Sequence, residues 1–414
     1  MSNIPEKSRT SSSRPLAAVI GGGPAGLMAA ERLAPHAEVQ VFDAMPSFGR
    51  KFLLAGKSGL NITHGEPFDD FLTRFGDART FLEPALRAFP PEAIRDWAAE
   101  LGIETFEGSS GRIFPTAMKA SPLLRAWLAR LRGAGVIFHV RHRWTGFTEE
   151  GSLRFRMPDG DSTHAAKAVV LALGGASWPR LGADGSWIPF VEAKGISVAP
   201  MRPANCGFDI AWSRHMKEHF AGAPVKSIML SFGGKQVKGD FVITSTGIEG
   251  SAVYALSAPL RDFLDAGTKA NLVVDLAPDR DETRLARDLA APRGKSSMAN
   301  HLRRKAGIDG AKAALLREHA GSDVFGDPER LAQSIKHLSM PIDRPRPVAE
   351  AISVAGGIAL GELNSDYMLV KMPGVFTAGE MLDWEAPTGG YLITACLATG
   401  RAAGEGAARF LTRS

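Results

Sequence analysis

The sequence predicts an α/β fold in which both ends of the chain build one Rossmann-like parallel sheet, while the middle of the chain forms an inserted unit. Three observations support this prediction. An apolar run at residues 16–20 passes directly into glycines and then into an Ala- and Leu-rich segment, which is the order strand, turn and helix. Apolar runs that end in glycine recur at residues 168–175 and 375–379. Between residues 201 and 344 the pattern changes to hairpins and short amphipathic helices.

The bulk composition is that of a globular protein with a sizeable core. The chain has 414 residues, enough for two or three domains, and its 44% of hydrophobic residues can fill a core in each. The formal net charge is only +5 and the basic residues are scattered, so a nucleic-acid partner is not expected. Residues 1–15 are polar and lack the apolar core of a signal peptide, so we interpret them as a flexible tail. No stretch approaches the roughly 18 apolar residues of a membrane span, and we expect a cytoplasmic protein without membrane contacts.

The cysteines and histidines do not predict a metal site. Two cysteines, Cys206 and Cys396, are too few for a disulfide framework or a cysteine-based metal centre, which fits a reducing compartment. Residues 215–219 match the zinc-peptidase pattern H-x-x-E-H, but surface histidines on a helix explain so short a match better. Cys206 opens the inserted unit and is a candidate for a redox role, whereas Cys396 is interpreted as packing within a helix.

The first glycine-rich turn predicts a dinucleotide site. Gly21, Gly23 and Gly26 form G-x-G-x-x-G between a strand and a helix, the context that this motif requires. The first glycine allows the tight turn, the second lets the backbone approach a pyrophosphate, and the third lets helix and strand pack closely. The phosphates then lie at the helix N-terminus, where free N–H groups favour negative charge. A second strand at 39–42 ends in an acid placed to bind a ribose, so the predicted site comprises Gly21, Gly23, Pro24, Ala25, Gly26, Asp43 and Ala44.

The C-terminal region favours FAD over NAD as the ligand. The strand at 375–378 leads into a polar segment at 379–383, and a second glycine turn at 387–391 precedes a small-residue helix at about 392–410. The N-terminus of that helix would direct N–H groups at an electron-rich atom such as O2 or N1 of a reduced flavin. The longer FAD gives a reason for the chain to return to the site, and NAD does not.

Several long motifs occur in the order found in one flavoprotein family. The chain resembles the aminoacetone-oxidase-like and bile-acid-reductase-like NAD(P)/FAD-dependent oxidoreductases over nearly its whole length. The motifs that carry this resemblance are GGGPAG at 21–26, GRKFLLAGKSGLNITH at 49–64, GSSGRIFP at 108–115, LALGGASWPRLGADGSW at 171–187, ITSTGIEGSAVYALS at 243–257 and AGEMLDWEAPTGGYLITACLATGRAAG at 378–404.

The resemblance implies a glutathione-reductase-like flavoprotein fold and a set of cofactor contacts. It places Arg50, Lys51, Asn61 and Thr63 along the pyrophosphate and flavin, and Val140 at the adenine. It places Ala172, Leu173, Gly174, Gly379, Glu380 and Asp383 beside the pyrophosphate and ribityl chain, and Gly390, Tyr391, Leu392 and Ile393 at the pyrimidine ring, with Gly389 as a further cofactor contact. The family often reads S-G-G-G-R-C-N where residues 55–61 read AGKSGLN, so thiol chemistry at that position is excluded here. Leu392 also stands where the family tends to have asparagine.

The middle of the chain predicts a separate insertion. Strands at 227–232 and 236–243 flank a Gly-Gly-Lys turn, and another strand is expected at 272–276. Helices are expected at 282–289, 297–306, 310–319 and 329–338. We interpret residues 201–344 as a β-barrel-like unit followed by a helical unit, inserted into a FAD-binding domain made of residues 16–200 and 345–414. The insert is expected to cover the flavin and shape a substrate pocket, with a purely structural insert as the alternative.

These observations predict a FAD-dependent oxidoreductase that performs two-electron chemistry at flavin N5 on a small organic substrate. In one case NAD(P)H reduces the flavin transiently, without a separate Rossmann domain to bind it. In the other case the substrate donates the electrons and oxygen accepts them. The alternative is a flavoprotein that uses FAD as a structural or redox-sensing group and binds RNA or a protein partner, which the modest charge disfavours. The candidate catalytic residues are Lys51, Trp178, Trp384, Tyr391 and Cys206.

Overall fold

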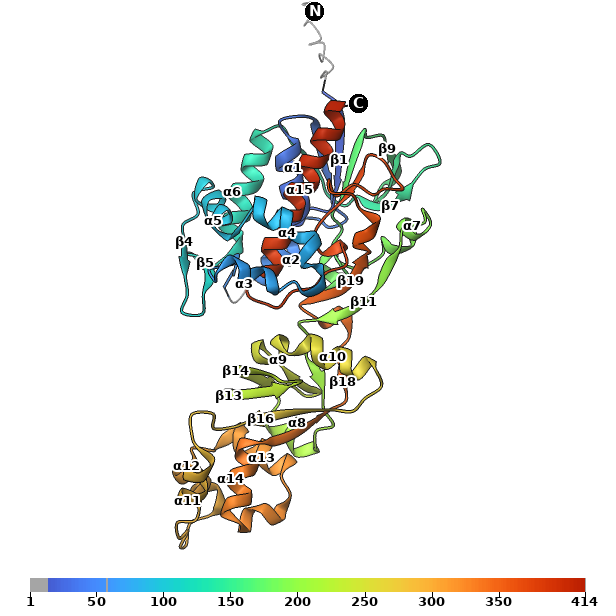
Figure 1. Ribbon diagram of the computed structural model, residues 1–414. Coiled ribbons are helices and arrows are strands. Elements are labelled where there is room, and N and C mark those ends of the chain that lie inside the picture. Colours follow the sequence, from blue (N-terminus) through green and yellow to red (C-terminus); the bar gives the residue numbers. More distant parts are fainter. Residues whose placement is uncertain (1–13, 57–58, 414) are drawn as a thin grey trace, which may run out of the picture. The chain divides into compact units, whose positions relative to one another are not determined.

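The computed structural model describes residues 14–56 and 59–413, so most of the predicted N-terminal tail lies outside the described residues. The chain forms two compact units (Figure 1). The first unit contains the chain up to Met201 together with the chain from Ala355 onward, and the second unit is Arg202–Val354. The chain leaves the first unit through β11 (Val198–Ala204) and returns through β19 (Ser353–Ile358), and these two strands pair with each other.

The first unit is built on the predicted Rossmann-like parallel sheet. Its five strands lie in the order β20-β10-β1-β2-β6, and every neighbouring pair is parallel. The C-terminal strand β20 lies beside β10, so both ends of the chain contribute to one sheet, as the sequence predicts. The strands are β1 (Leu16–Ile20), β2 (Glu38–Phe42), β6 (Ile137–His139), β10 (Ala168–Leu171) and β20 (Val375–Thr377).

Two helices from opposite ends of the chain pack against each other on this sheet. Helix α1 (Pro24–Leu33) follows the first glycine turn, and α15 (Tyr391–Arg413) is the last element of the chain (Figure 1). The contact is close because α15 carries small residues: a Cβ on Gly400 would lie 2.2 Å from the backbone oxygen of Ala25. The α15 segment therefore forms part of the core of the first unit rather than a peripheral tail.

The remaining elements of the first unit surround this framework. Strands β3 (Thr63–His64), β5 (Arg112–Pro115) and β4 (Thr105–Glu107) form one small antiparallel sheet, and β7 (Arg143–Phe147), β8 (Leu153–Met157) and β9 (Gly160–His164) form another. The helices are α2 (Arg50–Ala55), α3 (Phe68–Thr73), α4 (Arg79–Ala88), α5 (Pro91–Glu100), α6 (Ala120–Gly133) and α7 (Ile188–Glu192).

The second unit has its own hydrophobic core and contains the predicted hairpin and helices. Its antiparallel sheet has the order β17-β16-β13-β14-β15-β12-β18. The hairpin is β13 (Pro224–Phe232) and β14 (Lys235–Ile243), joined at the expected glycine turn. The other strands are β12 (Phe208–Asp209), β15 (Gly247–Glu249), β16 (Ala270–Asp275), β17 (Leu338–Ile342) and β18 (Arg344–Pro345). The helices are α8 (Arg214–His219), α9 (Ser251–Ala255), α10 (Ser257–Asp265), α11 (Glu282–Leu289), α12 (Met298–Ala306), α13 (Gly310–His319) and α14 (Pro328–Lys336).

Several sequence-based expectations can be placed on this fold. Cys206 is buried in the core of the second unit. His215 and His219 lie on α8, and within residues 14–56 and 59–413 no group of His, Cys, Asp and Glu side chains is arranged to hold a metal ion. None of the described helices is long and apolar enough to cross a lipid bilayer. The role of the second unit as a cover for the flavin stays a prediction.

Candidate functional site

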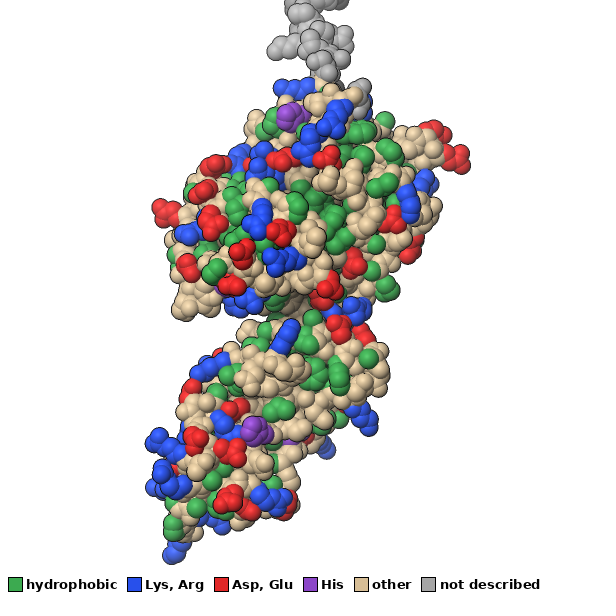
Figure 2. All heavy atoms as spheres, in the orientation of Figure 1, with side chains coloured by type: hydrophobic (Ala, Val, Ile, Leu, Met, Phe, Trp, Pro, Cys, Tyr) green, Lys and Arg blue, Asp and Glu red, His purple; other side chains and the backbone are tan. Residues whose placement is uncertain are grey.

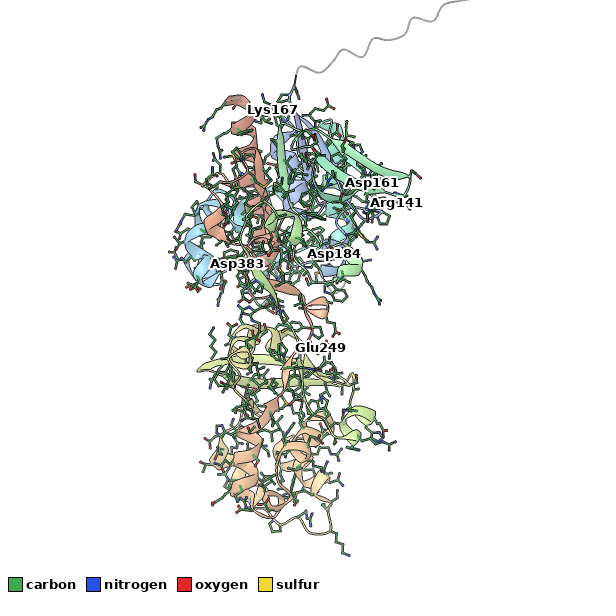
Figure 3. All side chains as sticks on the ribbon, turned by 90° about the vertical axis from the view of Figure 1, so that its right-hand side faces the viewer. Arg141, Asp161, Lys167, Asp184, Glu249 and Asp383 are labelled. Carbon is green, nitrogen blue, oxygen red and sulfur yellow. The ribbon has the colours of Figure 1, made fainter. Side chains whose placement is uncertain are left out.

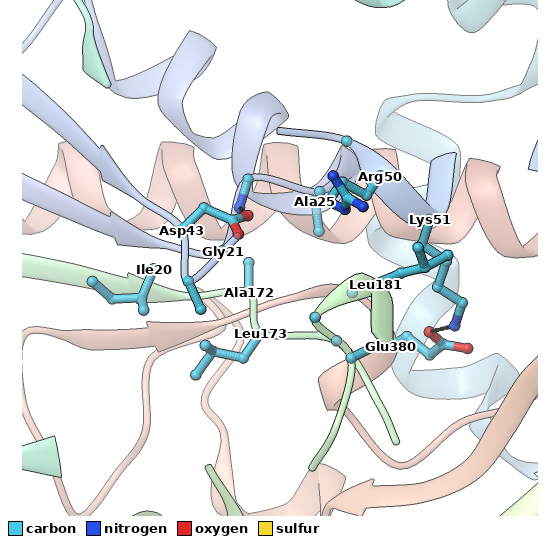
Figure 4. Close-up of a pocket in the computed structure, with 18 of the residues that line it drawn as sticks. Ile20, Gly21, Ala25, Asp43, Arg50, Lys51, Ala172, Leu173, Leu181 and Glu380 are labelled. Atoms are coloured by element: carbon cyan, nitrogen blue, oxygen red, sulfur yellow. Dashed lines mark hydrogen bonds and ion pairs between the residues drawn. The ribbon is translucent and has the colours of Figure 1, made fainter. Parts of the chain in front are cut away.

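The carboxyl ends of the parallel strands open onto one cavity that communicates with solvent. Open α/β sheets bind ligands at this edge, where the loops after the strands diverge. The lining comes from both ends of the chain, including residues 20–25, 42–44 and 378–380 (Figure 4). The predicted cofactor residues that line it are Gly21, Gly23, Pro24, Ala25, Asp43, Ala44, Arg50, Lys51, Ala172, Leu173, Gly174, Gly379 and Glu380.

The glycines of the first turn have different surroundings. A Cβ on Gly21, whose φ is +106°, would lie 2.2 Å from the carbonyl oxygen of Ala172, so the turn needs glycine there. A Cβ on Gly26 would lie 1.9 Å from the carbonyl oxygen of Gly21. At Gly23, by contrast, a Cβ would meet nothing within 4 Å. Gly23 also precedes α1 as its N-cap without a side-chain capping bond, so the N–H groups of the first helical turn remain available to an anion.

Asp43 lies at the end of β2 and is tied to the glycine turn. Its carboxylate accepts hydrogen bonds of 2.8 Å from the backbone N–H groups of Gly22 and Met45. Burial raises the pKa of Asp43, although the two backbone hydrogen bonds and the nearby Arg50 and Arg143 act in the opposite direction. Since a carboxylate has about four acceptor positions and two are used, the side chain can still accept hydrogen bonds from ribose hydroxyls.

An ion pair lies on the other side of the cavity from Asp43 (Figure 4). The Lys51 ammonium donates hydrogen bonds of 2.6 Å to the Glu380 carboxylate and to the Ser177 hydroxyl. Ser177 is fully buried, so this bond anchors one side of the ammonium within the protein. Cys396 also lines the cavity, where burial, together with the charge of Glu380, raises the pKa of its thiol to about 12. The thiol is therefore protonated at neutral pH and is not a nucleophile.

Two tryptophans hold glycines of the cavity wall. The Trp384 indole N–H donates a 2.9 Å hydrogen bond to the Gly379 carbonyl, and the Trp187 indole does the same to Gly174. Trp384 is buried and does not line the cavity, and its hydrogen bond supports the cavity wall; its role as a candidate catalytic residue stays a prediction. Trp178 does not line the cavity either; it has a left-handed φ of +60° at the start of a short 3-10 turn, Pro179–Leu181.

The predicted flavin contacts near α15 do not line this cavity. A Cβ on Gly390 would lie 2.5 Å from the backbone of Thr63, so β3 and the start of α15 pack directly on each other. The Thr394 hydroxyl donates a 2.8 Å bond to the Thr63 hydroxyl. The contact roles of these residues and of the others outside the lining stay predictions; the full set is Gly26, Asn61, Thr63, Val140, Trp178, Cys206, Asp383, Trp384, Gly389, Gly390, Tyr391, Leu392 and Ile393.

Tyr391 belongs to a partly buried polar cluster. Its hydroxyl donates a 2.6 Å hydrogen bond to Glu66, which also accepts two bonds from the Arg74 guanidinium. The His64 ring stacks on the Tyr391 ring at 5.3 Å. Partial burial alone would raise the pKa of Glu66, but the hydrogen bonds from Arg74 and Tyr391 outweigh it and hold the pKa below its usual value. The cluster fastens the first residue of α15 to the segment after β3.

Sequence reasoning missed the residues that close the cavity beside Asp43. The strand order places β6 next to β2, and the backbone N–H of His142 donates a 2.9 Å bond to the Asp43 carbonyl. This brings the start of β7 to the cavity, whereas the predicted Val140 is exposed. No local sequence signal identifies these residues, because they reach the cavity only through the pairing of β6 with β2. The missed lining residues include Ser47, Gly49, His142, Arg143, Trp144, Leu181, Gly182, Ala183, Asp184, Ser186 and Trp187.

The polar groups of this region fit a flavin dinucleotide. The open position at Gly23 and the free N–H groups of α1 suit a pyrophosphate, and Asp43 suits the adenosine ribose. Within the described part of the chain, Arg50 Nε and Asn61 Oδ1 are buried without a hydrogen-bond partner. Buried polar atoms are rarely left unpaired, so these two are available to a ligand that carries acceptors and donors.

Comparisons with known proteins agree with this fit. The family model described as HI0933-like protein Rossmann domain matches residues 16–406. A 3-dehydro-bile acid delta(4,6)-reductase from Clostridium scindens is 25% identical over 407 residues, which are 94% of this chain and 98% of that protein. A ribosomal RNA dihydrouridine synthase from Escherichia coli is 24% identical over 388 residues, or 91% and 93% of the two chains.

A solved structure shares the fold. The 3-ketosteroid delta1-dehydrogenase from Sterolibacterium denitrificans, in complex with 1,4-androstadiene-3,17-dione, matches with a TM-score of 0.54 and 13% identity, over 97% of this chain and 100% of that chain. At this identity the likeness extends to the fold alone. From its family match and the cofactor cavity, this chain belongs to the HI0933-like family and is a FAD-dependent oxidoreductase.

Proposed function

We propose that this protein reduces a carbon–carbon double bond that is conjugated to a carbonyl group, with NAD(P)H as the source of electrons. The names of both curated relatives support this reaction class. A delta(4,6)-reductase and a dihydrouridine synthase each add two hydrogens across such a bond in their own substrates. The shared chemistry is narrower than oxidoreduction in general, and it favours a reductase over an oxidase.

The observation that carries the proposal is the Lys51 ammonium at one side of the cofactor cavity. An ammonium has three N–H donors, and Lys51 uses two of them on Glu380 and Ser177. The third can donate to the carbonyl oxygen of a substrate, which draws electron density out of the conjugated double bond. When bound, reduced FAD would supply the hydride to one carbon of the double bond, and a proton from solvent would complete the addition at the other carbon. Glu380 and Ser177 hold the ammonium in place before the substrate arrives.

The test uses the purified holoprotein under anaerobic conditions. Stopped-flow absorbance of the flavin is followed after mixing with NADPH or NADH, and the reduced protein is then mixed with a 3-oxo-4,6-diene bile acid. The proposal expects bleaching by a reduced nicotinamide and rapid return of colour with the unsaturated ketone but not with its saturated analogue. No bleaching by either nucleotide, or an equally slow return of colour with the unsaturated ketone and with its saturated analogue, would contradict it.

A Lys51→Met variant sharpens this test, because methionine keeps the unbranched shape of the side chain but has no N–H donor. Reoxidation by the unsaturated ketone is expected to fall by about 10²–10³-fold, the size of the loss when one preorganised donor is removed. Reduction by the nucleotide should change much less. Equal losses in both steps would indicate that Lys51 supports the cofactor instead of the substrate.

RNA is a second candidate substrate, and one observation favours it. Residues 284–304 of the second unit carry exposed basic side chains that form no ion pair with any residue in the described ranges, and Figure 2 shows basic side chains gathered over this part. They are Arg284, Arg293, Lys295, Arg303 and Arg304. The net charge of the whole chain therefore understates the local positive charge, which suits a phosphate backbone.

This candidate is tested by binding of a ribosomal RNA fragment at several salt concentrations. If RNA is the substrate, changing Arg303 and Arg304 to glutamate should weaken binding and reduce its salt dependence, since each phosphate contact contributes to the slope. Arg125→Glu on α6 serves as a control with a similar exposed side chain. Binding that is absent, or equal in all variants, would leave the small unsaturated ketone as the substrate.

A further inference from the structure

A second groove adjoins the cofactor cavity within the first unit. It lies on the small β7-β8-β9 sheet, with Phe190 of α7 at its border. Arg143, Trp144 and Ser186 line both the groove and the cofactor cavity, so the two spaces are neighbours. The groove is therefore next to the side of the cavity where Asp43 and His142 lie.

Three arginines share one face of this sheet. Arg143 on β7 is directly opposite Arg156 on β8 in the strand register, and Arg154 is two residues from Arg156. Leu153 and Phe155, which alternate with these arginines, are buried, so the arginines lie on the exposed face. Like charges directly opposite each other on neighbouring strands are unfavourable, and an anion between them would relieve this repulsion.

The nearby acids neutralise this face only in part. Arg143 pairs with Asp184 at 2.8 Å, whereas the 3.8 Å pair between Arg156 and Asp161 is largely exposed and contributes little (Asp161 and Asp184 are labelled in Figure 3). Arg154 has no ion pair to any residue that the structure describes. The groove thus retains positive charge in the form of guanidinium groups, which match the geometry of phosphate oxygens.

Trp144 adds an independent indication of a ligand. Its side chain is 4% exposed, lines both spaces, and has an indole N–H without a hydrogen-bond partner within the described residues. A buried tryptophan normally finds a partner for this group. The Phe190 ring packs against the indole at 5.5 Å, so an apolar surface lies beside the arginines. The aromatic ring of Phe190, an unused N–H and arginines together suit a phosphorylated nucleoside.

We propose that this groove binds a nucleoside that carries a phosphomonoester, and that this ligand is the 2′-phosphoadenosine half of NADPH. This assignment of the source rests on the proposed function, in which a reduced nicotinamide nucleotide donates electrons. NADH lacks the 2′-phosphate, so the arginines would distinguish the two nucleotides. Arg154 and Arg156 bind the phosphate, Thr163 adds a hydroxyl on the neighbouring strand opposite Arg154, and the Phe190 ring at the border of the groove contacts the base.

The experiment is isothermal titration calorimetry of the FAD-loaded protein, because bound FAD blocks the neighbouring cavity. The probes are adenosine 2′,5′-bisphosphate, 5′-AMP, ATP and inorganic phosphate. The bisphosphate is expected to bind at least about tenfold tighter than 5′-AMP, the difference that one phosphate bound by arginine makes. The Arg154→Ala/Arg156→Ala double variant should lose this preference, and Arg125→Ala, an exposed arginine outside the groove, should keep it.

The outcomes separate this proposal from the proposed function. No binding of the bisphosphate, or binding that does not change in the double variant, overturns the groove as a nucleotide site, even if the enzyme proves to be a reductase. If binding depends on the arginines but ATP or inorganic phosphate binds as tightly as the bisphosphate, the assignment to NADPH is overturned. Arginine-dependent preference for the bisphosphate supports the groove site, even if flavin bleaching then shows that the proposed double-bond reduction is wrong.

Discussion

Two glycine-rich turns lead into helices in this molecule, and they have opposite surroundings. In the turn before α1, a Cβ on Gly23 would enter open space inside the cofactor cavity. In the turn before α15, a Cβ on Gly390 would collide with the backbone of Thr63, and one on Gly389 would lie 2.7 Å from the Tyr391 ring. The first turn leaves room for a ligand, whereas the second is filled by the protein itself.

The difference shows that glycines in a turn before a helix can be required for two reasons, close contact with a ligand or close contact with the protein. Glycine is needed wherever backbone approaches something closely, and that partner can be a cofactor or another strand. Before α1, Gly21 and Gly26 lie close to protein backbone, whereas Gly23 faces the open space of the cofactor cavity. Around α15 both glycines approach protein, and the Tyr391–Glu66 hydrogen bond reinforces the contact. Substitutions at these positions should therefore separate loss of fold from loss of cofactor.

The largest effect is expected for Gly26→Val. The side chain would overlap the Gly21 carbonyl and force the strand, turn and helix apart, at a cost of about 3 kcal/mol or more in the free energy of unfolding. Thermal unfolding of the cofactor-free protein should show a much lower midpoint, and bound flavin should be lost as a consequence. An unchanged midpoint without cofactor would show that Gly26 is not a packing position.

Gly390→Ala should destabilise the fold by about 1–3 kcal/mol, because φ is +99° and the new methyl group meets the Thr63 backbone. Denaturant unfolding with and without FAD measures this loss in the free energy of unfolding. The loss should be similar in both forms if this turn only joins β3 to α15. A loss confined to the FAD-bound form would instead place the flavin at this turn, as the family resemblance implies.

Tyr391→Phe removes a hydrogen bond to the Glu66 carboxylate and should cost about 1.5 kcal/mol at neutral pH. The pH dependence has a definite sign. Because the fold lowers the pKa of Glu66, its contribution is complete above the unfolded value of about 4.3 and is lost as pH falls through the folded value. The stability gap between wild type and variant should therefore shrink in acid. A gap that is constant down to strong acid would contradict the role of the carboxylate.

The parallel sheet and several helices of the second unit were predictable from local patterns. Apolar runs that end in glycine identify β1, β10 and β20, and helical periodicity places α11 and α13 with their observed bounds. The turn around Gly21–Gly26 and the acid Asp43 could also be placed at the ligand edge, because motif, strand and helix agree there. These features depend on residues close together in sequence, where local preferences and burial act in the same direction.

The rest of the site depends on long-range packing that the sequence does not encode locally. The indole N–H of Trp384 donates to the Gly379 carbonyl, a contact that no local sequence pattern indicates. The Lys51–Glu380–Ser177 group joins three distant segments, and their hydrogen bonds exist only after the sheet has formed. Trp144 and Arg143 reach the cavity only because β6 pairs with β2. Apolar and aromatic residues near glycines do not reveal which of them support the cavity wall and which contact a ligand.

The most direct test of the account is the flavin content of Gly23→Val beside wild type. The backbone at Gly23 has φ −85° and ψ −177°, which valine adopts readily, and its side chain would project into open space. This variant is expected to fold with a near-normal unfolding midpoint in its cofactor-free form, to purify without the yellow cofactor and not to take up added FAD. A variant that folds normally and retains stoichiometric FAD would contradict the placement of the cofactor in this cavity.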